Sequence, residues 1–229
     1  MRRYARENAC FRDAARELAG ARDADVMLET LDSLDLPEGL GWELRKLIQA
    51  GRERDGAGYD RETASRDAIA ILKEGRKRVG DWSIDEDSFD AIADGLQRTY
   101  RRGRRNYKAA CAKPSIEALH EWRKRVKDLW YHYTLLRPLW PPVMTALGDE
   151  AHDLSDRLGD DHDLAVLADW FREHTEPDLD LQEAIDRRRA ELQQEAFDIG
   201  ARLYAEKPSA YVRRLERLWN AGRAGVRAP

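Results

Sequence analysis

The chain is patterned almost throughout as a series of amphipathic helices. Apolar residues recur three and four positions apart, the spacing that places them on one side of a helix, and Gly or Pro residues separate the segments. Alternating apolar and polar runs joined by a tight hairpin turn, which would indicate strands, are almost absent. The pattern predicts an all-α protein with helices over residues 4–19, 22–34, 39–50, 60–79, 86–111, 115–137, 142–157, 162–173, 178–206 and 209–222.

The boundaries of one helix are marked especially clearly. Ser115 follows Pro114 and is typical of an N-cap. Glu117 lies in the first turn, where a carboxylate stabilises the helix by interacting with its dipole. Pro138 is expected to end the same helix. Asp23 and Asp163 are expected at the starts of two other helices, and the Gly-, Arg- and Asp-rich segment 51–59 is expected to be a flexible connection.

Charge is distributed very unevenly along this pattern. Residues 98–127 contain eleven Lys or Arg residues but only two acids, which gives the window a charge of +9. The whole chain carries −4, so the remaining residues together carry −13. A nucleic-acid binder tends to be basic as a whole domain, whereas a basic stretch in an acidic chain indicates a local anion site.

The basic residues of this window form two rows with helical spacing. One row is Arg98, Arg101, Arg102 and Arg105, and the other is His120, Arg123, Lys124 and Lys127. Apolar residues occupy the opposite side of each predicted helix, and Gly103 would allow a neighbouring helix to approach closely. These apolar residues are Phe89, Ile92, Leu96, Tyr100 and Tyr107 for the first row, and Leu119, Trp122, Val126, Leu129, Tyr133 and Leu136 for the second. Because like charges one turn apart repel each other, acid-free rows of this kind favour an anionic ligand over a plain solvated surface.

Composition limits the remaining possibilities. The 229 residues can bury a core in one large domain or two small ones, and 42% hydrophobic residues with seven Trp indicate a globular protein. Cys10 and Cys111 belong to no motif, which argues against a disulfide scaffold. No apolar leader and no run of about 20 apolar residues is present. We therefore expect a soluble, cytoplasmic protein.

A weak internal repeat relates two parts of the chain. At an offset of 140 residues, segment 18–27 matches segment 158–167 at Leu18/Leu158, Asp23/Asp163 and Val26/Val166. A repeat of this length implies two similar helical halves. The counterpart of His120 would fall before Met1, so the first half is expected to lack its first cationic helix.

Three segments in order resemble the CHAD domain family, the conserved histidine α-helical domain. They are Thr99–Tyr107, Leu119–Lys127 with its His-x-x-Arg-Lys-x-x-Lys pattern, and Leu158–Leu164 with Leu-Gly-Asp-Asp-His-Asp-Leu. Segments 11–18 and 21–27 look like the matching part of the first half, so the resemblance covers essentially the whole chain. Relatives often carry Arg-Tyr after the histidine motif, where this chain has Trp130-Tyr131.

The resemblance implies an all-α fold of two pseudo-symmetric antiparallel helical bundles, in one domain with a first half of about 1–112 and a second half of about 113–229. It also implies a non-catalytic module, without metal or other cofactor, that binds inorganic polyphosphate or similar phosphate or sulfate anions in a basic groove, and it suggests association with polyphosphate granules. The expected ligand-binding residues are the two rows, with four further cations as weaker candidates. These four are Arg12, Arg16, Arg202 and Lys207.

Other functions fit parts of the same sequence. His152-Asp153 and His162-Asp163 could belong to a metal-dependent phosphohydrolase, although such a site needs ligands from further helices. Phosphate contacts alone would also bind a nucleic-acid backbone, but Tyr131 is the only aromatic residue on the cationic faces that could stack on a base. A pure scaffold that binds no anion is the third alternative.

Overall fold

The computed structural model describes residues 2–17, 23–55, 61–82, 88–176 and 178–225, and nearly all of these residues are helical. Within these ranges there is no strand, which confirms the all-α prediction. By its contacts the chain divides into unit 1, Met1–Asp85, and unit 2, Glu86–Pro229. The predicted division into halves near residue 112 was inferred from a sequence repeat, whereas units 1 and 2 are defined by contacts. The two halves and the missing first helix therefore stay predictions.

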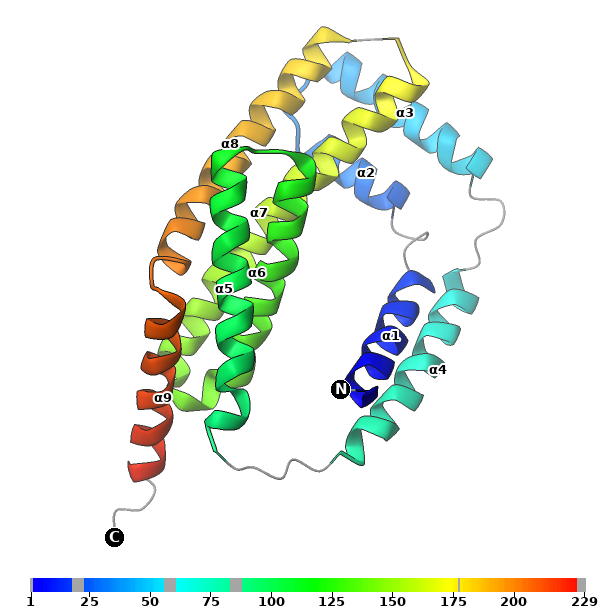
Figure 1. Ribbon diagram of the computed structural model, residues 1–229. Helices are drawn as coiled ribbons and strands as arrows, with labels where there is room; N and C mark the ends of the chain where they lie inside the picture. The colour runs from blue at the N-terminus through cyan, green and yellow to red at the C-terminus, as the bar shows by residue number, and fades with distance from the viewer. Residues whose placement is uncertain (1, 18–22, 56–60, 83–87, 177, 226–229) are drawn as a thin grey trace. The chain divides into compact units, whose positions relative to one another are not determined.

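Unit 1 consists of two helix pairs. Helix α1 (Arg2–Glu17) packs antiparallel to α4 (Arg61–Gly80), and α2 (Asp23–Asp32) packs against α3 (Glu38–Asp55) (Figure 1). Small residues allow α1 and α4 to approach closely, since a side-chain carbon added at Gly75 would lie only 3.3 Å from Cys10 Sγ. Helix α3 continues through Asp55, so residues 51–55 of the expected connection 51–59 are helical, and residues 56–59 lie outside the described residues.

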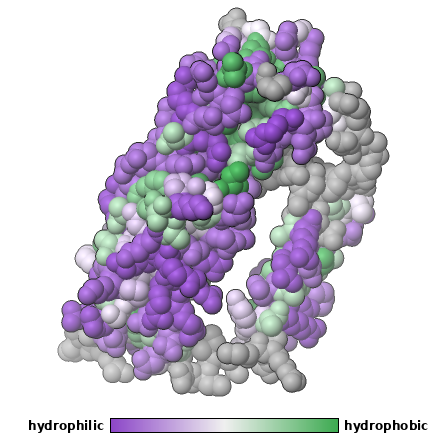
Figure 2. Space-filling view, turned by 45° about the horizontal axis from the view of Figure 1, so that its top comes forward, coloured by the Kyte–Doolittle hydropathy of each residue, from purple (hydrophilic) through white to green (hydrophobic). Residues whose placement is uncertain are grey.

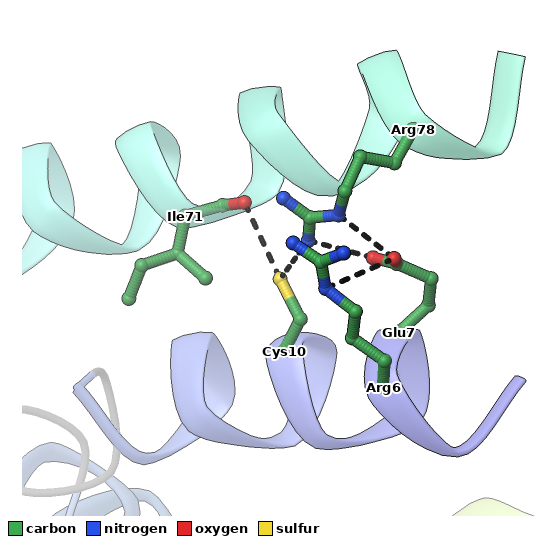
Figure 3. Close-up of polar contacts among 5 residues, drawn as sticks. All are labelled: Arg6, Glu7, Cys10, Ile71 and Arg78. Carbon is green, nitrogen blue, oxygen red and sulfur yellow. Dashed lines mark hydrogen bonds and ion pairs between the residues drawn. The ribbon is translucent and has the colours of Figure 1, made fainter. Parts of the chain in front are cut away.

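A buried ion pair joins the first helix pair. Glu7 on α1 is only 4% exposed and accepts two hydrogen bonds of 2.7 Å from Nε and Nη2 of Arg78 on α4 (Figure 3). The same guanidinium donates to Cys10 Sγ at 3.3 Å. The hydrogen bond from Arg78 lowers the pKa of Glu7, so this pair favours the folded state above the ordinary pKa of a glutamate and weakens as the pH falls.

Unit 2 is a bundle of five helices. They are α5 (Asp90–Ala112), α6 (Ile116–Leu136), α7 (Pro141–His174), α8 (Leu179–Leu203) and α9 (Pro208–Gly225), with a short 3₁₀ turn, η3 (Arg137–Leu139), before α7. Helix α6 packs against both α5 and α7, α7 packs against α8, and α9 lies against α5 (Figure 1). The Ser115 side chain accepts a hydrogen bond from Ala118 N at the start of α6, which confirms the predicted cap.

The core of unit 2 is rich in large aromatic residues. Trp122 is fully buried on α6 and stacks on Phe197 of α8, and Tyr100 of α5 stacks on Tyr211 of α9 with ring centres 4.0 Å apart. All six apolar residues predicted behind the second cationic row are buried. Behind the first row Phe89, Leu96 and Tyr100 are buried and Tyr107 is partly buried, but Ile92 is 37% exposed, so its assignment to the core was wrong.

One predicted helix boundary is absent. Residues 158–161 were expected to separate two helices, but α7 is continuous from Pro141 to His174, so Asp163 lies inside it and starts no helix. Gly159 instead leaves room for a neighbouring side chain, and Asp161 is buried where it accepts hydrogen bonds from Arg189 and Gln193 of α8. A Gly that serves tertiary packing was thus mistaken for a helix-ending signal.

The surface of the helices is mainly hydrophilic. Figure 2 shows polar residues over most of the displayed face, with apolar residues gathered in small patches. None of the helices in the described ranges combines the length and the apolar character that a membrane crossing requires. The large exposed apolar residues of unit 2 include Tyr131, Leu135 and Trp140, which follow one another near the end of α6.

Candidate anion-binding surface

The first cationic row, here called the α5 row, consists of Arg98, Arg101, Arg102 and Arg105. All four residues are exposed, on the side of α5 opposite buried Tyr100 and Gly103. Arg98 lies 3.9 Å from the carboxylate of Asp94, and Arg101 donates to the neutral amide of Gln97. Within the described ranges, neither Arg102 nor Arg105 forms an ion pair, so this row keeps most of its positive charge.

The second cationic row, here called the α6 row, consists of His120, Arg123, Lys124 and Lys127. Lys124 forms an exposed ion pair of 2.6 Å with Glu121, whose pKa is lowered chiefly by this hydrogen bond. Arg123 and Lys127 are partly buried, and neither has a carboxylate partner among the residues that the structure describes. The two helices that carry the rows were identified from sequence, and the structure brings them side by side.

Arg123 is held in place by α7. Its Nε donates to the Ser155 carbonyl oxygen at 3.1 Å, a contact that leaves the charge of the guanidinium uncompensated. A side-chain carbon added at Gly159 would lie 2.8 Å from Arg123 Nη2 and 3.2 Å from its Cζ. The absence of a side chain at Gly159 therefore creates the space in which this cation lies.

His120 lies against a second histidine that the sequence analysis did not pair with it. Its ring centre is 4.8 Å from that of His162 on α7, and the Nδ1 atoms of both rings are buried without a hydrogen-bond partner in the described structure. Burial lowers the pKa of His120, and the neighbouring Lys124 and His162 lower it further. His120 is therefore mostly neutral at pH 7 while no anion is bound.

The two rows share a register across the helix pair. Asn106 Nδ2 on α5 donates to the Glu121 carbonyl oxygen on α6 at 3.1 Å, so these residues lie level on antiparallel helices. Arg102, one turn before Asn106, then lies near the level of Lys124 and Arg125. The acids close to this seam are already bound, Glu121 by Lys124 and Asp128 by Arg125. The rows thus lie on two neighbouring helices, with Arg102 and Lys124 at about the same level.

The four weaker candidates are less well placed. Arg12 and Arg16 lie on α1 in unit 1, and Arg16 is paired with Asp13 at 3.2 Å. Arg202 near the end of α8 is paired with Glu150 of α7 at 3.4 Å, and Lys207 is exposed in the turn before α9. Arg104, which was not among the candidates, donates to the Tyr204 carbonyl oxygen and links α5 to the end of α8.

The sequence also suggested a second set of residues as candidate metal ligands. His152 Nδ1 lies 2.9 Å from a carboxylate oxygen of Asp156, and Asp161 accepts a hydrogen bond from Arg189 of α8. Burial and the charges of Asp156 and Asp163 raise the pKa of Asp160. In the parts of the chain that the structure describes, no three His, Cys, Asp or Glu side chains are grouped so that they could hold a metal ion.

Comparison with known proteins gives one match. The family model of the CHAD domain matches residues 1–172, which takes in unit 1 and helices α5, α6 and most of α7 with both cationic rows. No curated protein and no solved structure matches the chain.

Proposed function

Because the chain belongs to the CHAD domain family, we propose that it binds inorganic polyphosphate on the α5 and α6 rows, as a non-catalytic binding module. CHAD domains are binding modules linked with polyphosphate. The ligand would lie along the outer faces of the two helices, with Arg123 and Lys127 on one side and Arg102 and Arg105 on the other. Association with polyphosphate granules in the cytoplasm is part of the same proposal.

The observation that supports the proposal best is the shortage of carboxylates around the rows. Five of the eight residues are arginines or lysines without an acidic partner in the described structure, namely Arg101, Arg102, Arg105, Arg123 and Lys127. Elsewhere in unit 2 some cations are paired, as Arg172 is with Asp169 and Arg188 with Glu191. Other exposed cations, such as Lys108 and Arg187, have no acidic partner in the described structure, so the rows differ in that their unpaired cations follow one another along a helix. Like charges on neighbouring turns repel each other unless an anion lies between them.

A linear polyphosphate suits this arrangement chemically. It presents charged oxygens at short, regular intervals and needs donors along a track, which the two rows would supply. Guanidinium groups bind phosphate oxygens through two parallel hydrogen bonds, and the Lys side chains supply flexible point charges. A single phosphate would use only one part of this surface, so affinity is expected to rise with the number of phosphates.

Calorimetry with polyphosphates of defined length tests the proposal. We expect affinity to increase from orthophosphate through short chains to long ones, to fall steeply as salt is raised, and to exceed that for single-stranded DNA at about 150 mM salt. No phosphate should be released during the titration. Equal affinity for DNA would favour a nucleic-acid backbone binder, phosphate release would favour a hydrolase, and absence of binding to any of these anions would favour a scaffold.

The neutral state of His120 predicts that binding depends on pH. A phosphate beside the ring raises the pKa of His120, so binding takes up a proton, and the affinity rises as the pH falls from 8 to 6. We expect the affinity to increase roughly threefold over this range. Full uptake of one proton on binding would give a larger increase, about tenfold per pH unit. In the free protein the lowered pKa of His120 makes the folded state less stable at low pH. The neutral ring favours the folded state above pH 6.5, and this contribution to stability is lost as the pH falls.

Titrations in buffers with different heats of ionisation measure this proton uptake directly. The variant His120→Gln keeps a polar side chain but cannot titrate, so its affinity is expected to stay constant over the same pH range. Glu121, Lys124 and Arg123 on α6 and His162 on α7 also surround the ring. A wild-type affinity that does not change between pH 8 and 6 would remove His120 from the site, and a pH dependence that persists in His120→Gln but not in His162→Gln would transfer the role to His162.

A further inference from the structure

The α6 row ends in an exposed aromatic ring. Tyr131 follows Lys127 one turn later on the same side of α6 as Lys124 and Lys127, and it is 52% exposed. At a rise of about 1.5 Å per residue, Tyr131 lies about 6 Å along the axis from Lys127 and about 16 Å from His120. The next residue on this side, Leu135, is 75% exposed and apolar. The track of cations therefore stops at Lys127 and is continued by an apolar surface.

The ring of Tyr131 stacks on the neighbouring ring of Trp130, which contacts α7. Its neighbour Trp130 is partly buried and stacks with it at 4.9 Å between ring centres, and His152 of α7 meets Trp130 edge-on at 4.3 Å. His152 is held in turn by Asp156 at 2.9 Å. This chain of contacts fixes the position of the aromatic pair against α7, so little conformational freedom would be lost when a flat ligand stacks on it.

Two of the three acids near the ring are paired with cations. Asp128 is paired with Arg125 at 2.9 Å and Glu121 with Lys124, while Asp156 lies 2.9 Å from Nδ1 of His152. Lys127, the cation closest to Tyr131 along this side, has no carboxylate partner in the described part of the chain. A phosphate at Lys127 and a flat ring on Tyr131 could thus be bound by one ligand.

We propose that the α6 row and Tyr131 together form a site for nucleoside polyphosphates, in which the phosphate chain lies along Lys127, Lys124 and His120 and the base stacks on Tyr131. The inference rests on the proposed polyphosphate-binding function and narrows it to chains that carry a nucleoside at one end. Stacking of a base on an aromatic side chain tolerates every base because each has a π face. Purines, which offer the larger face, bind more tightly than pyrimidines.

Calorimetry with paired ligands of equal phosphate number tests this site. Adenosine 5′-tetraphosphate is compared with inorganic tetraphosphate at the same pH and salt, and we expect the nucleotide to bind about tenfold more tightly to the wild-type protein. Tyr131→Leu keeps an apolar side chain without a π face and is expected to abolish this preference. Tyr131→Phe keeps the ring and is expected to retain it. Affinity for inorganic tetraphosphate should be the same in all three proteins.

The matched control is Leu179→Ala, which removes an exposed apolar side chain from the start of α8, away from both rows, and should leave both affinities unchanged. If the nucleotide binds no more tightly than inorganic tetraphosphate, or if its advantage survives Tyr131→Leu, the nucleoside site is overturned while polyphosphate binding stands. If neither ligand binds the wild-type protein, both proposals are overturned. Quenching of Trp fluorescence by the nucleotide but not by inorganic tetraphosphate would support stacking at Trp130-Tyr131.

Discussion

Replacement of Arg123 and Lys127 by alanine in the same protein is expected to weaken polyphosphate binding about 30-fold. Each side chain supplies a charge-assisted contact that we take as about 1 kcal/mol at this partly exposed surface, and about 2 kcal/mol corresponds to roughly 30-fold in affinity. Neither cation has a carboxylate partner in the described structure, so no internal ion pair is lost with it. Calorimetry at fixed salt measures the loss, and a smaller dependence of affinity on salt should accompany it.

The control for this double variant is Arg172→Ala/Arg188→Ala. It removes the same amount of charge from unit 2, but from two exposed cations that are paired with Asp169 and Glu191. If this control loses as much affinity, the ligand responds to overall charge and not to the rows. Arg123 also contacts the Ser155 carbonyl, so Arg102→Ala/Arg105→Ala is a second test that leaves α7 untouched. Unchanged affinity in both row variants would remove the proposed site.

The second large effect concerns stability. A side-chain carbon added at Gly200 would lie 2.6 Å from Trp122 Cζ2 and 2.9 Å from Tyr107 Cδ2, and both rings are rigid. Gly200→Ala is therefore expected to destabilise the protein by about 2 kcal/mol, despite the gain in helix propensity. Gly148 is the matched control on α7, because an added carbon there would make an ordinary contact of 3.6 Å with Tyr133 Cβ. Gly148→Ala should be neutral or stabilising by up to about 1 kcal/mol.

Urea unfolding of the two variants, followed by tryptophan fluorescence and by circular dichroism, measures the difference. The free energy of unfolding should fall in Gly200→Ala, and the near-ultraviolet signal of Trp122 should change because its ring must move. Equal stability of the two variants would show that α8 can shift away from Trp122 without cost. That result would contradict the close packing between α6 and α8.

Much of unit 2 could be predicted from sequence because its helices are strongly amphipathic. The cap at Ser115, the buried side of α6 and the two cationic rows all depend on residues within one helix, and helical spacing alone places them. The expectation that Gly103 allows close approach is also confirmed, since an added carbon there would lie 2.5 Å from Tyr204 Oη. That partner is about 100 positions away and could not have been named from the sequence.

The features that sequence analysis missed all depend on contacts between helices. Gly159 resembled a helix end, but its function is to leave room for Arg123 of another helix. Asp161 is buried because Arg189 and Gln193 of α8 compensate it, and the sequence alone does not pair it with them. His162 was considered with its sequence neighbour Asp163, whereas its ring lies against His120. Local spacing contains no information about such partners.

Contacts of the core with α8 and α9 limit where this protein can be cut into soluble fragments. Tyr100 stacks on Tyr211, and Trp122 contacts α8. The matched family region stops at residue 172, yet both rings are covered by side chains from α8 and α9, beyond that point. A fragment trimmed to the family boundary would expose these rings to water and is expected to aggregate. A soluble fragment that carries both cationic rows should instead run from about residue 86 to residue 225.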